Sequence, residues 1–126
     1  MAKILIVDDE ELARFALQEI LEADGHVISV ACNGVEGLNM ALRGGMDLVV
    51  TDIIMPDKEG VEMIKDLKAR LPDLPVIAIS GGGRTRNLNF LEIAQHFGAD
   101  AVLAKPFTPD ALQGVVASLL QRPSTT

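Results

Sequence analysis

The sequence has no tryptophan, no tyrosine and only four phenylalanines. Without aromatic side chains to serve as platforms, recognition of stacked bases is not expected. The single cysteine, Cys32, excludes an internal disulfide and a zinc site built from several cysteines. We expect Cys32 to be a small buried residue that fills space after the second strand.

Long apolar runs are absent as well. No stretch approaches the roughly 18 apolar residues that a membrane helix needs. The first apolar run, Ile4–Val7, stops at Asp8 and is too short for the core of a signal peptide. We therefore expect a protein of the reducing cytoplasm that does not interact with membranes.

Basic residues are in the minority, with 11 Lys and Arg against 18 Asp and Glu and a net charge of −7. Proteins that bind nucleic acids or anionic membranes through charge need an excess of Lys and Arg, so both classes are disfavoured. Hydrophobic residues make up 48% of the 126 residues, which excludes disorder and suffices for one core. We expect one domain over residues 1–121 and a short polar tail over 122–126.

Five short runs rich in Val and Ile do not alternate with polar residues and are too short for typical helices. Such runs are typical of strands in a parallel sheet that is covered on both faces. The predicted strands are Lys3–Val7, His26–Ala31, Asp47–Thr51, Pro75–Ile79 and Ala101–Ala104.

Helical periodicity separates these runs, and each helix carries a start or stop signal. Asn33 followed by Glu36 resembles a capping box, and Thr108 before Pro109 is a strong start signal. The predicted stops are Gly25, Gly44, Pro72 and Gly98. The alternation of strands and helices predicts a single α/β domain, a three-layer (βα)₅ fold with a doubly wound parallel sheet of five strands.

Four of the five predicted strands run into a residue that is able to contact a metal or a phosphate. Asp8 and Asp9 follow the first strand, Asp52 the third, Ser80 the fourth and Lys105 the fifth. In a doubly wound sheet the carboxyl ends of all strands meet at one edge, where ligands bind. The sequence therefore predicts that three carboxylates, a hydroxyl and an ammonium converge.

Three carboxylates in one place repel each other, and a cation relieves that repulsion. Mg²⁺ suits hard oxygen ligands and keeps positions open for phosphate oxygens. With Mg²⁺ and Lys105 the charges balance, so the site fits a ligand that brings its own negative charge, such as a phosphoryl group. We expect Asp52 to be the nucleophile that forms an aspartyl-phosphate, with Asp8 and Asp9 at the metal.

Simpler interpretations exist for the same residues. In one, Asp8 and Asp9 only cap the next helix, because carboxylates stabilise a helix N-terminus. In the other, Asp52 is an ordinary aspartate of a loop. The glycines at 81–83 match no nucleotide-binding pattern, so we interpret them as a flexible loop.

Taken together, the sequence resembles the response-regulator receiver domain of two-component phosphorelays over almost its whole length. The segments that carry the resemblance are Ile6–Glu10, Asp47–Pro56, Gly60, Val76–Ser80, Gly98–Ala101 and Lys105–Phe107. The resemblance implies a flavodoxin-like strand order of 2-1-3-4-5. It also implies phosphorylation of Asp52, with Ser80 and Lys105 as its catalytic partners and Mg²⁺ held by Asp8, Asp9, Asp52 and Ile54.

The resemblance also implies partners. A sensor histidine kinase or a histidine phosphotransfer protein would supply the phosphoryl group, and an unknown protein would respond to it. We expect a stand-alone receiver or a fragment of a longer regulator, without direct nucleic-acid contact, as a monomer or a weak phosphorylation-dependent dimer. It would not be an enzyme in the usual sense, because the phosphoryl group stays on the chain as a signal.

Two features depart from the family pattern. The aromatic residue that usually takes part in the switch is replaced by Val102, which has no ring to move. The segment after Ser80 opens with three glycines, followed by Arg84 and Arg86, and we expect this loop to be the moving part. The residues two beyond Asp52 and Ser80, Ile54 and Gly82, would flank the path of an attacking water.

Three other functions remain open at this point. A Mg²⁺-dependent phosphatase with an aspartyl-phosphate intermediate usually has a D-x-D motif and a cap domain. A pseudo-receiver would be an interaction module with the fold alone. A flavin carrier of the flavodoxin type would need aromatic residues around its ring.

Overall fold

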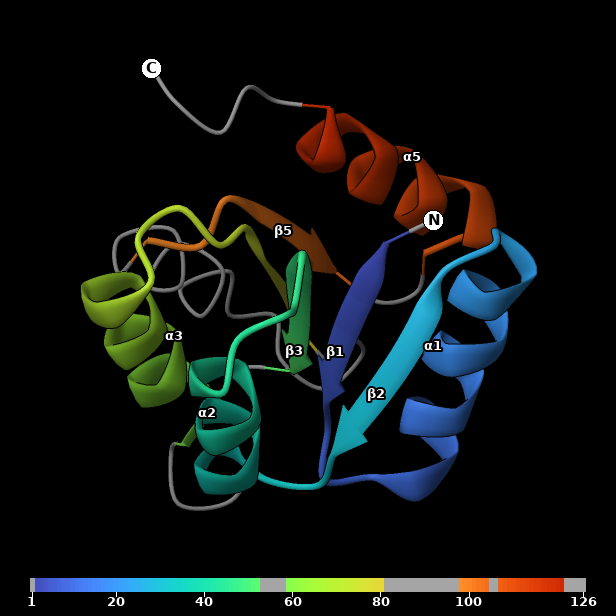
Figure 1. Ribbon diagram of the computed structural model, residues 1–126. Helices are drawn as coiled ribbons and strands as arrows, with labels where there is room; N and C mark the ends of the chain where they lie inside the picture. Colours follow the sequence, from blue (N-terminus) through green and yellow to red (C-terminus); the bar gives the residue numbers. More distant parts are fainter. Residues whose placement is uncertain (1, 53–58, 81–97, 105–106, 122–126) are drawn as a thin grey trace.

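In the computed structural model, five parallel strands form one sheet with helices on both faces (Figure 1). The structure describes residues 2–52, 59–80, 98–104 and 107–121, and for residues 59–61 and 80 only the main chain. The elements in chain order are β1 (Lys3–Val7), α1 (Glu11–Ala23), β2 (Val27–Ala31), α2 (Gly34–Leu42), β3 (Leu48–Asp52), α3 (Glu59–Arg70), β4 (Val76–Ser80), β5 (Ala101–Ala104) and α5 (Pro109–Leu120).

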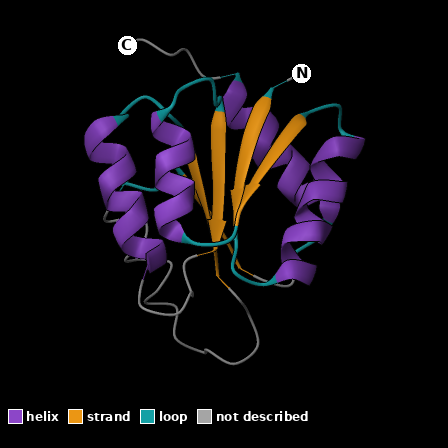
Figure 2. Ribbon diagram, turned by 60° about the horizontal axis from the view of Figure 1, so that its bottom comes forward, coloured by secondary structure: helices purple, strands orange, loops and turns teal. Residues whose placement is uncertain are grey.

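The strand order is β2-β1-β3-β4-β5, and every neighbouring pair is parallel. The α/β class and the 2-1-3-4-5 order are therefore confirmed. Figure 2 shows the strands running in one direction between two layers of helices. The strands start up to one residue later than predicted, and β3 and β4 continue through Asp52 and Ser80. These two residues thus belong to the sheet and are held by its register.

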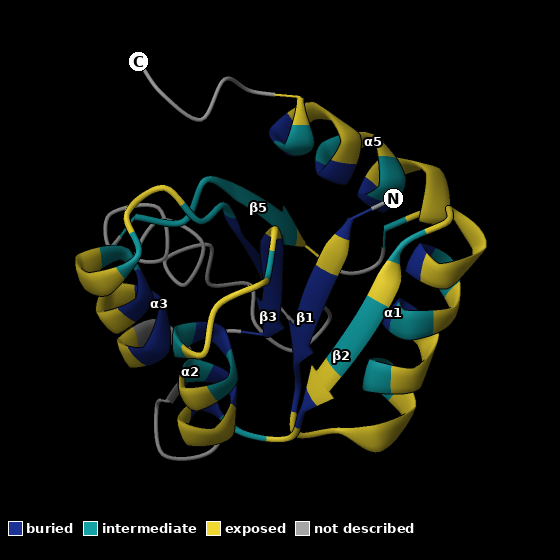
Figure 3. Ribbon diagram, viewed as in Figure 1, coloured by how far each residue is buried: buried dark blue, intermediate teal, exposed yellow. Residues whose placement is uncertain are grey.

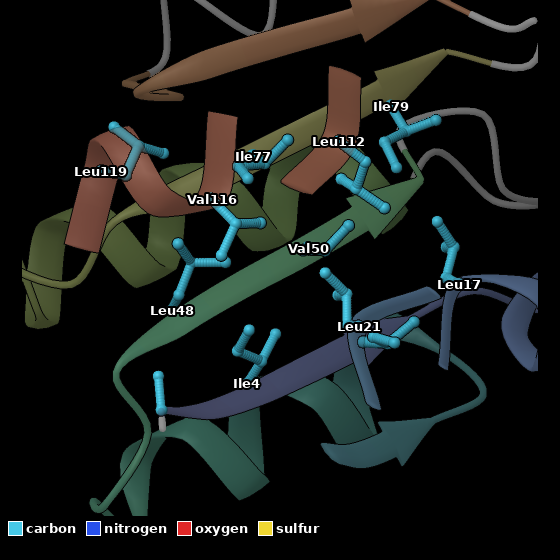
Figure 4. Close-up of a cluster of buried hydrophobic side chains, with 12 residues drawn as sticks. Ile4, Leu17, Leu21, Leu48, Val50, Ile77, Ile79, Leu112, Val116 and Leu119 are labelled. Atoms are coloured by element: carbon cyan, nitrogen blue, oxygen red, sulfur yellow. The ribbon is translucent and has the colours of Figure 1, made fainter. Parts of the chain in front are cut away.

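Alternating side chains of each central strand enter two separate cores. In β1, Leu5 and Val7 face α2 and α3, whereas Ile4 and Ile6 face α1 and α5. Figure 4 shows the second core, in which sheet residues pack against α1 and α5. Its labelled members are Ile4, Leu17, Leu21, Leu48, Val50, Ile77, Ile79, Leu112, Val116 and Leu119. Burial of each such side chain contributes about 1.5–3 kcal/mol, which explains why the central strands are apolar without alternation.

The edge strands differ from the central ones (Figure 3). In β2, Val27 and Val30 are exposed, and β5 is only half-buried. The prediction that the strands are covered on both faces holds for β2 and β5 in part: side chains of each pack against both cores, but they are less buried than those of the central strands. The prediction that Cys32 is buried is wrong. Cys32 is exposed, since it lies beyond the end of edge strand β2.

The helix boundaries follow the predicted signals. The Asn33 side chain accepts a hydrogen bond from the Glu36 amide at 2.8 Å, and the Glu36 carboxylate accepts one from the Cys32 amide at 2.9 Å. This is a capping box shifted by one residue. Thr108 caps α5 by accepting from the Ala111 amide at 3.0 Å. The fourth predicted helix, before Gly98, and the tail 122–126 lie outside the described residues.

Among the described residues, no helix has the length and apolar character needed to cross a membrane.

Candidate functional site

The carboxyl edge of the sheet brings two of the predicted acidic residues together. Asp8 directly follows β1 and is fully buried, and Asp52 is the last residue of β3 and is 7% exposed. Val7 and Thr51 are partners in the register of these neighbouring strands. Asp8 and Asp52, which follow them in the chain, therefore lie at the same level of the carboxyl edge. A pair of buried carboxylates at one edge is a concentrated negative charge that favours a cation.

Hydrogen bonds hold Asp8 through its main chain and its side chain. Its amide donates to the Ala31 carbonyl at 3.1 Å. Its carboxylate oxygen Oδ1 accepts from the Glu10 amide at 2.9 Å, and its carbonyl accepts from Nη1 of Arg14 at 2.9 Å. The interpretation of Asp8 as a helix-capping residue is thus partly correct, because Glu10 is the N-cap residue of α1. Capping by one oxygen is compatible with a role at the site.

Asp9 occupies a different environment from Asp8 and Asp52, because it is exposed. Among residues 2–52, 59–80, 98–104 and 107–121, no three His, Cys, Asp or Glu side chains form a group that would hold a metal ion. The predicted cluster of three carboxylates is therefore reduced here to the buried pair Asp8 and Asp52. That pair fits Mg²⁺, which typically uses one or two carboxylates and keeps several waters. Coordination of Mg²⁺ by Asp8, Asp9, Asp52 and Ile54 stays a prediction.

The main chains of β4 and β5 reach the same edge. Ser80 is the last residue of β4 and is paired with Ala104, the last residue of β5. In the neighbouring pair, Asp52 lies opposite Ile79, so Ser80 extends one residue beyond the level of Asp52. Lys105 follows Ala104 in the chain, but Lys105 and Ile54 lie outside the described residues. The catalytic roles of Ser80 and Lys105 therefore stay predictions.

Two residues near the acidic pair were not predicted from the sequence. Thr51 is fully buried, and its hydroxyl donates to the carbonyl of Asp52 at 3.1 Å. Arg14 contacts the carbonyl of Asp8 from the second turn of α1. Thr51 could have been identified from the sequence, because it is a polar residue within an otherwise apolar strand. An arginine on a half-exposed helix gives no comparable signal.

Val102, which replaces the family's switch aromatic, is half-buried in β5. It lies opposite Ala78 and packs against the core formed with α2 and α3. The segment 81–97, which includes the predicted moving loop, lies outside the described residues.

Comparison with known proteins gives a consistent result. A family model for the response regulator receiver domain matches residues 4–117. The transcriptional regulatory protein CusR of Escherichia coli (strain K12) is 33% identical over 121 residues, covering 95% of this chain and 52% of CusR. The response regulator MprA of Mycobacterium leprae (strain TN) is 32% identical over 120 residues, covering 95% of this chain and 51% of MprA. The chain spans about half the length of these curated relatives.

A solved structure agrees over nearly the whole length. The crystal structure of a response regulator receiver domain protein from Clostridium thermocellum matches with a TM-score of 0.88 and 31% sequence identity. The match covers 97% of this chain and 96% of that chain.

Proposed function

The chain belongs to the response regulator receiver domain family, and from this premise we propose that Asp52 accepts a phosphoryl group from a histidine kinase or a histidine phosphotransfer protein. The observation that carries the proposal is the pair of buried carboxylates, Asp8 and Asp52, at the carboxyl ends of β1 and β3. A carboxylate at that position is a suitable nucleophile for phosphoryl transfer.

In the proposed reaction, a carboxylate oxygen of Asp52 forms a bond to phosphorus while the P–N bond of the donor's phosphohistidine breaks. The leaving imidazole takes up a proton. Asp52 is held for this step by strand β3 and by the hydrogen bond from the Thr51 hydroxyl to its carbonyl. Ser80 would donate to a phosphoryl oxygen, and the Lys105 ammonium would balance negative charge on the transferred group.

The proposed metal ligands are Asp8, Asp9, Asp52 and Ile54. Mg²⁺ bound there would supply positive charge close to the oxygens of the phosphoryl group. The contribution of this chain is the fixed pair of carboxylates: within the described part of the chain, Asp8 is held by hydrogen bonds to Ala31, Glu10 and Arg14, and Asp52 by the register of β3.

The consequence of phosphorylation would be a change in partner binding. A phosphoryl group that interacts differently with two conformers shifts the population toward one of them, and a partner then selects that conformer. The surface that we propose for the downstream partner is the face formed by the predicted fourth helix, which lies outside the described residues, together with β5 and α5. The phosphoryl group remains on the chain, so the product is a signal and not a released metabolite.

Intact-mass spectrometry tests this function. The chain is incubated with acetyl phosphate and Mg²⁺, alongside Asp52→Asn and Asp66→Asn. Asp66 is an exposed carboxylate of α3 and serves as the matched control. We expect the wild type and Asp66→Asn to gain the mass of one phosphoryl group and Asp52→Asn to gain none. Lack of a gain in the wild type contradicts the proposal and supports a pseudo-receiver. Continuous hydrolysis of a phosphate monoester would support a phosphatase.

A further inference from the structure

Arg14 reaches from α1 to the loop that carries the acidic residues. Its Nη1 donates to the carbonyl oxygen of Asp8 at 2.9 Å, in a partly buried contact. This oxygen belongs to the peptide group that joins Asp8 to Asp9. The side chain of Arg14 therefore holds the link between the buried acid and the exposed one.

Further hydrogen bonds among the described residues act on either side of this peptide group. The Asp8 amide is bound to Ala31 of β2, and Oδ1 of Asp8 is bound to the Glu10 amide. The Arg14 amide donates to the Glu10 carbonyl at 3.0 Å, which begins the hydrogen bonding of α1. The Arg14 side chain thus adds a contact to the Asp8–Asp9 peptide group itself.

We propose that Arg14 is a positioning residue for divalent-cation binding at this site. By holding the Asp8–Asp9 peptide, it fixes the main chain from which the exposed carboxylate of Asp9 would reach a cation bound by the buried carboxylates of Asp8 and Asp52. The proposal rests on the function proposed above, in which these carboxylates bind Mg²⁺. Residues that orient metal ligands without touching the metal typically affect metal affinity strongly.

The positive charge of Arg14 has the opposite effect from its hydrogen bond. A guanidinium beside the site repels a divalent cation, so an arginine that acted only through its charge would weaken Mg²⁺ binding. Its removal would then tighten binding. An arginine that acts as a tether gives the reverse, because its removal releases Asp9. The sign of the change in Mg²⁺ affinity therefore distinguishes the two roles.

Calorimetric titration with Mg²⁺ in the absence of a phosphate donor measures that sign. The variants are Arg14→Met and the control Arg43→Met, which removes the same charge from the exposed C-cap of α2. We expect the Mg²⁺ dissociation constant of Arg14→Met to rise about tenfold or more, and that of Arg43→Met to stay close to the wild-type value. Unchanged or tighter binding by Arg14→Met overturns the proposal.

A further variant covers the case in which Arg14→Met does not fold. Arg14→Lys keeps the charge on a shorter side chain that lacks the guanidinium fork. Weaker Mg²⁺ binding by Arg14→Lys supports the tether, and wild-type affinity overturns it.

Hydrogen exchange of the metal-free protein tests the tether without any ligand. We expect the amides of Asp9 and Glu10 to exchange faster in Arg14→Met, while those of Leu17 and Leu21 within α1 are unchanged. Equal exchange at Asp9 and Glu10 in both proteins overturns the inference. A wild type that binds no Mg²⁺ and accepts no phosphoryl group would instead contradict the proposed function, whatever the exchange rates show.

Discussion

The ammonium of Lys68 and the carboxylate of Asp100 form an ion pair with a distance of 3.0 Å, at the end of the sheet opposite the acidic pair. Lys68 also donates to the Leu74 carbonyl at 3.0 Å, and Asp100 accepts from the Val76 amide at 2.8 Å. These contacts join α3, the start of β4 and the segment that enters β5. They fix the entry of an edge strand that is otherwise only half-buried.

Replacement of Asp100 by alanine should lower the free energy of unfolding by about 2 kcal/mol. The two side chains are 17% and 16% exposed, so the ion pair is shielded from solvent and worth more than a surface pair. Urea unfolding of the wild type, Asp100→Ala and Asp100→Asn measures the effect. The asparagine variant should lose less, because its amide oxygen still accepts from the Val76 amide. If Asp100→Ala lost less than about 0.5 kcal/mol of unfolding free energy, the ion pair would contribute no more than an exposed pair does.

Mg²⁺ should stabilise the wild-type chain against unfolding. At a concentration one hundred times the dissociation constant, a ligand that binds only the folded state contributes about 2.7 kcal/mol. In Asp8→Asn the amide oxygen still accepts from the Glu10 amide, but one buried carboxylate is lost. Urea midpoints measured with Mg²⁺ and with a chelator should therefore differ clearly in the wild type and little in Asp8→Asn. Equal shifts in both proteins would exclude Asp8 from the metal site.

Gln113 links α5 to α1, since its side-chain amide donates to the Ile20 carbonyl at 3.0 Å. Ile20 lies in the last turn of α1, where helix carbonyls lack a partner within the helix. Gln113→Ala should therefore cost about 1 kcal/mol in unfolding free energy. The control is Gln18→Ala, which removes an exposed bond to Glu22 and should cost about 0.3 kcal/mol. Equal losses would mean that the interhelical bond adds no special stability.

The thiol of Cys32 should react in the folded protein. It is exposed beyond the end of β2, and its sulfur accepts a long hydrogen bond from Nδ2 of Asn33 at 3.8 Å. Ellman's reagent should react with one thiol per chain in native buffer, and the reaction should take no longer than it does for the unfolded chain in denaturant. The variant Cys32→Ser should give no signal. A thiol that reacts only after unfolding would restore the interpretation of Cys32 as a buried residue.

The local structure could be predicted because its causes are local. The range Lys3–Val7 matches β1 to the residue, since a run of apolar side chains ending at a charge is a property of adjacent positions. Asn33 and Thr108 were recognised as caps for the same reason. The strand order followed from family motifs and not from periodicity, because the pairing of β1 with β3 joins residues far apart in the sequence.

At the site, the sequence alone determined which residue types follow each strand, and the shared edge of a parallel sheet places Asp8 and Asp52 together. Tertiary structure alone decided that Cys32 is exposed, because exposure depends on β2 being an edge strand. It also decided that Arg14 holds the carbonyl of Asp8. A strand or a helix is encoded by its own neighbours in the chain, whereas a contact between a side chain and a distant loop exists only once the elements have packed.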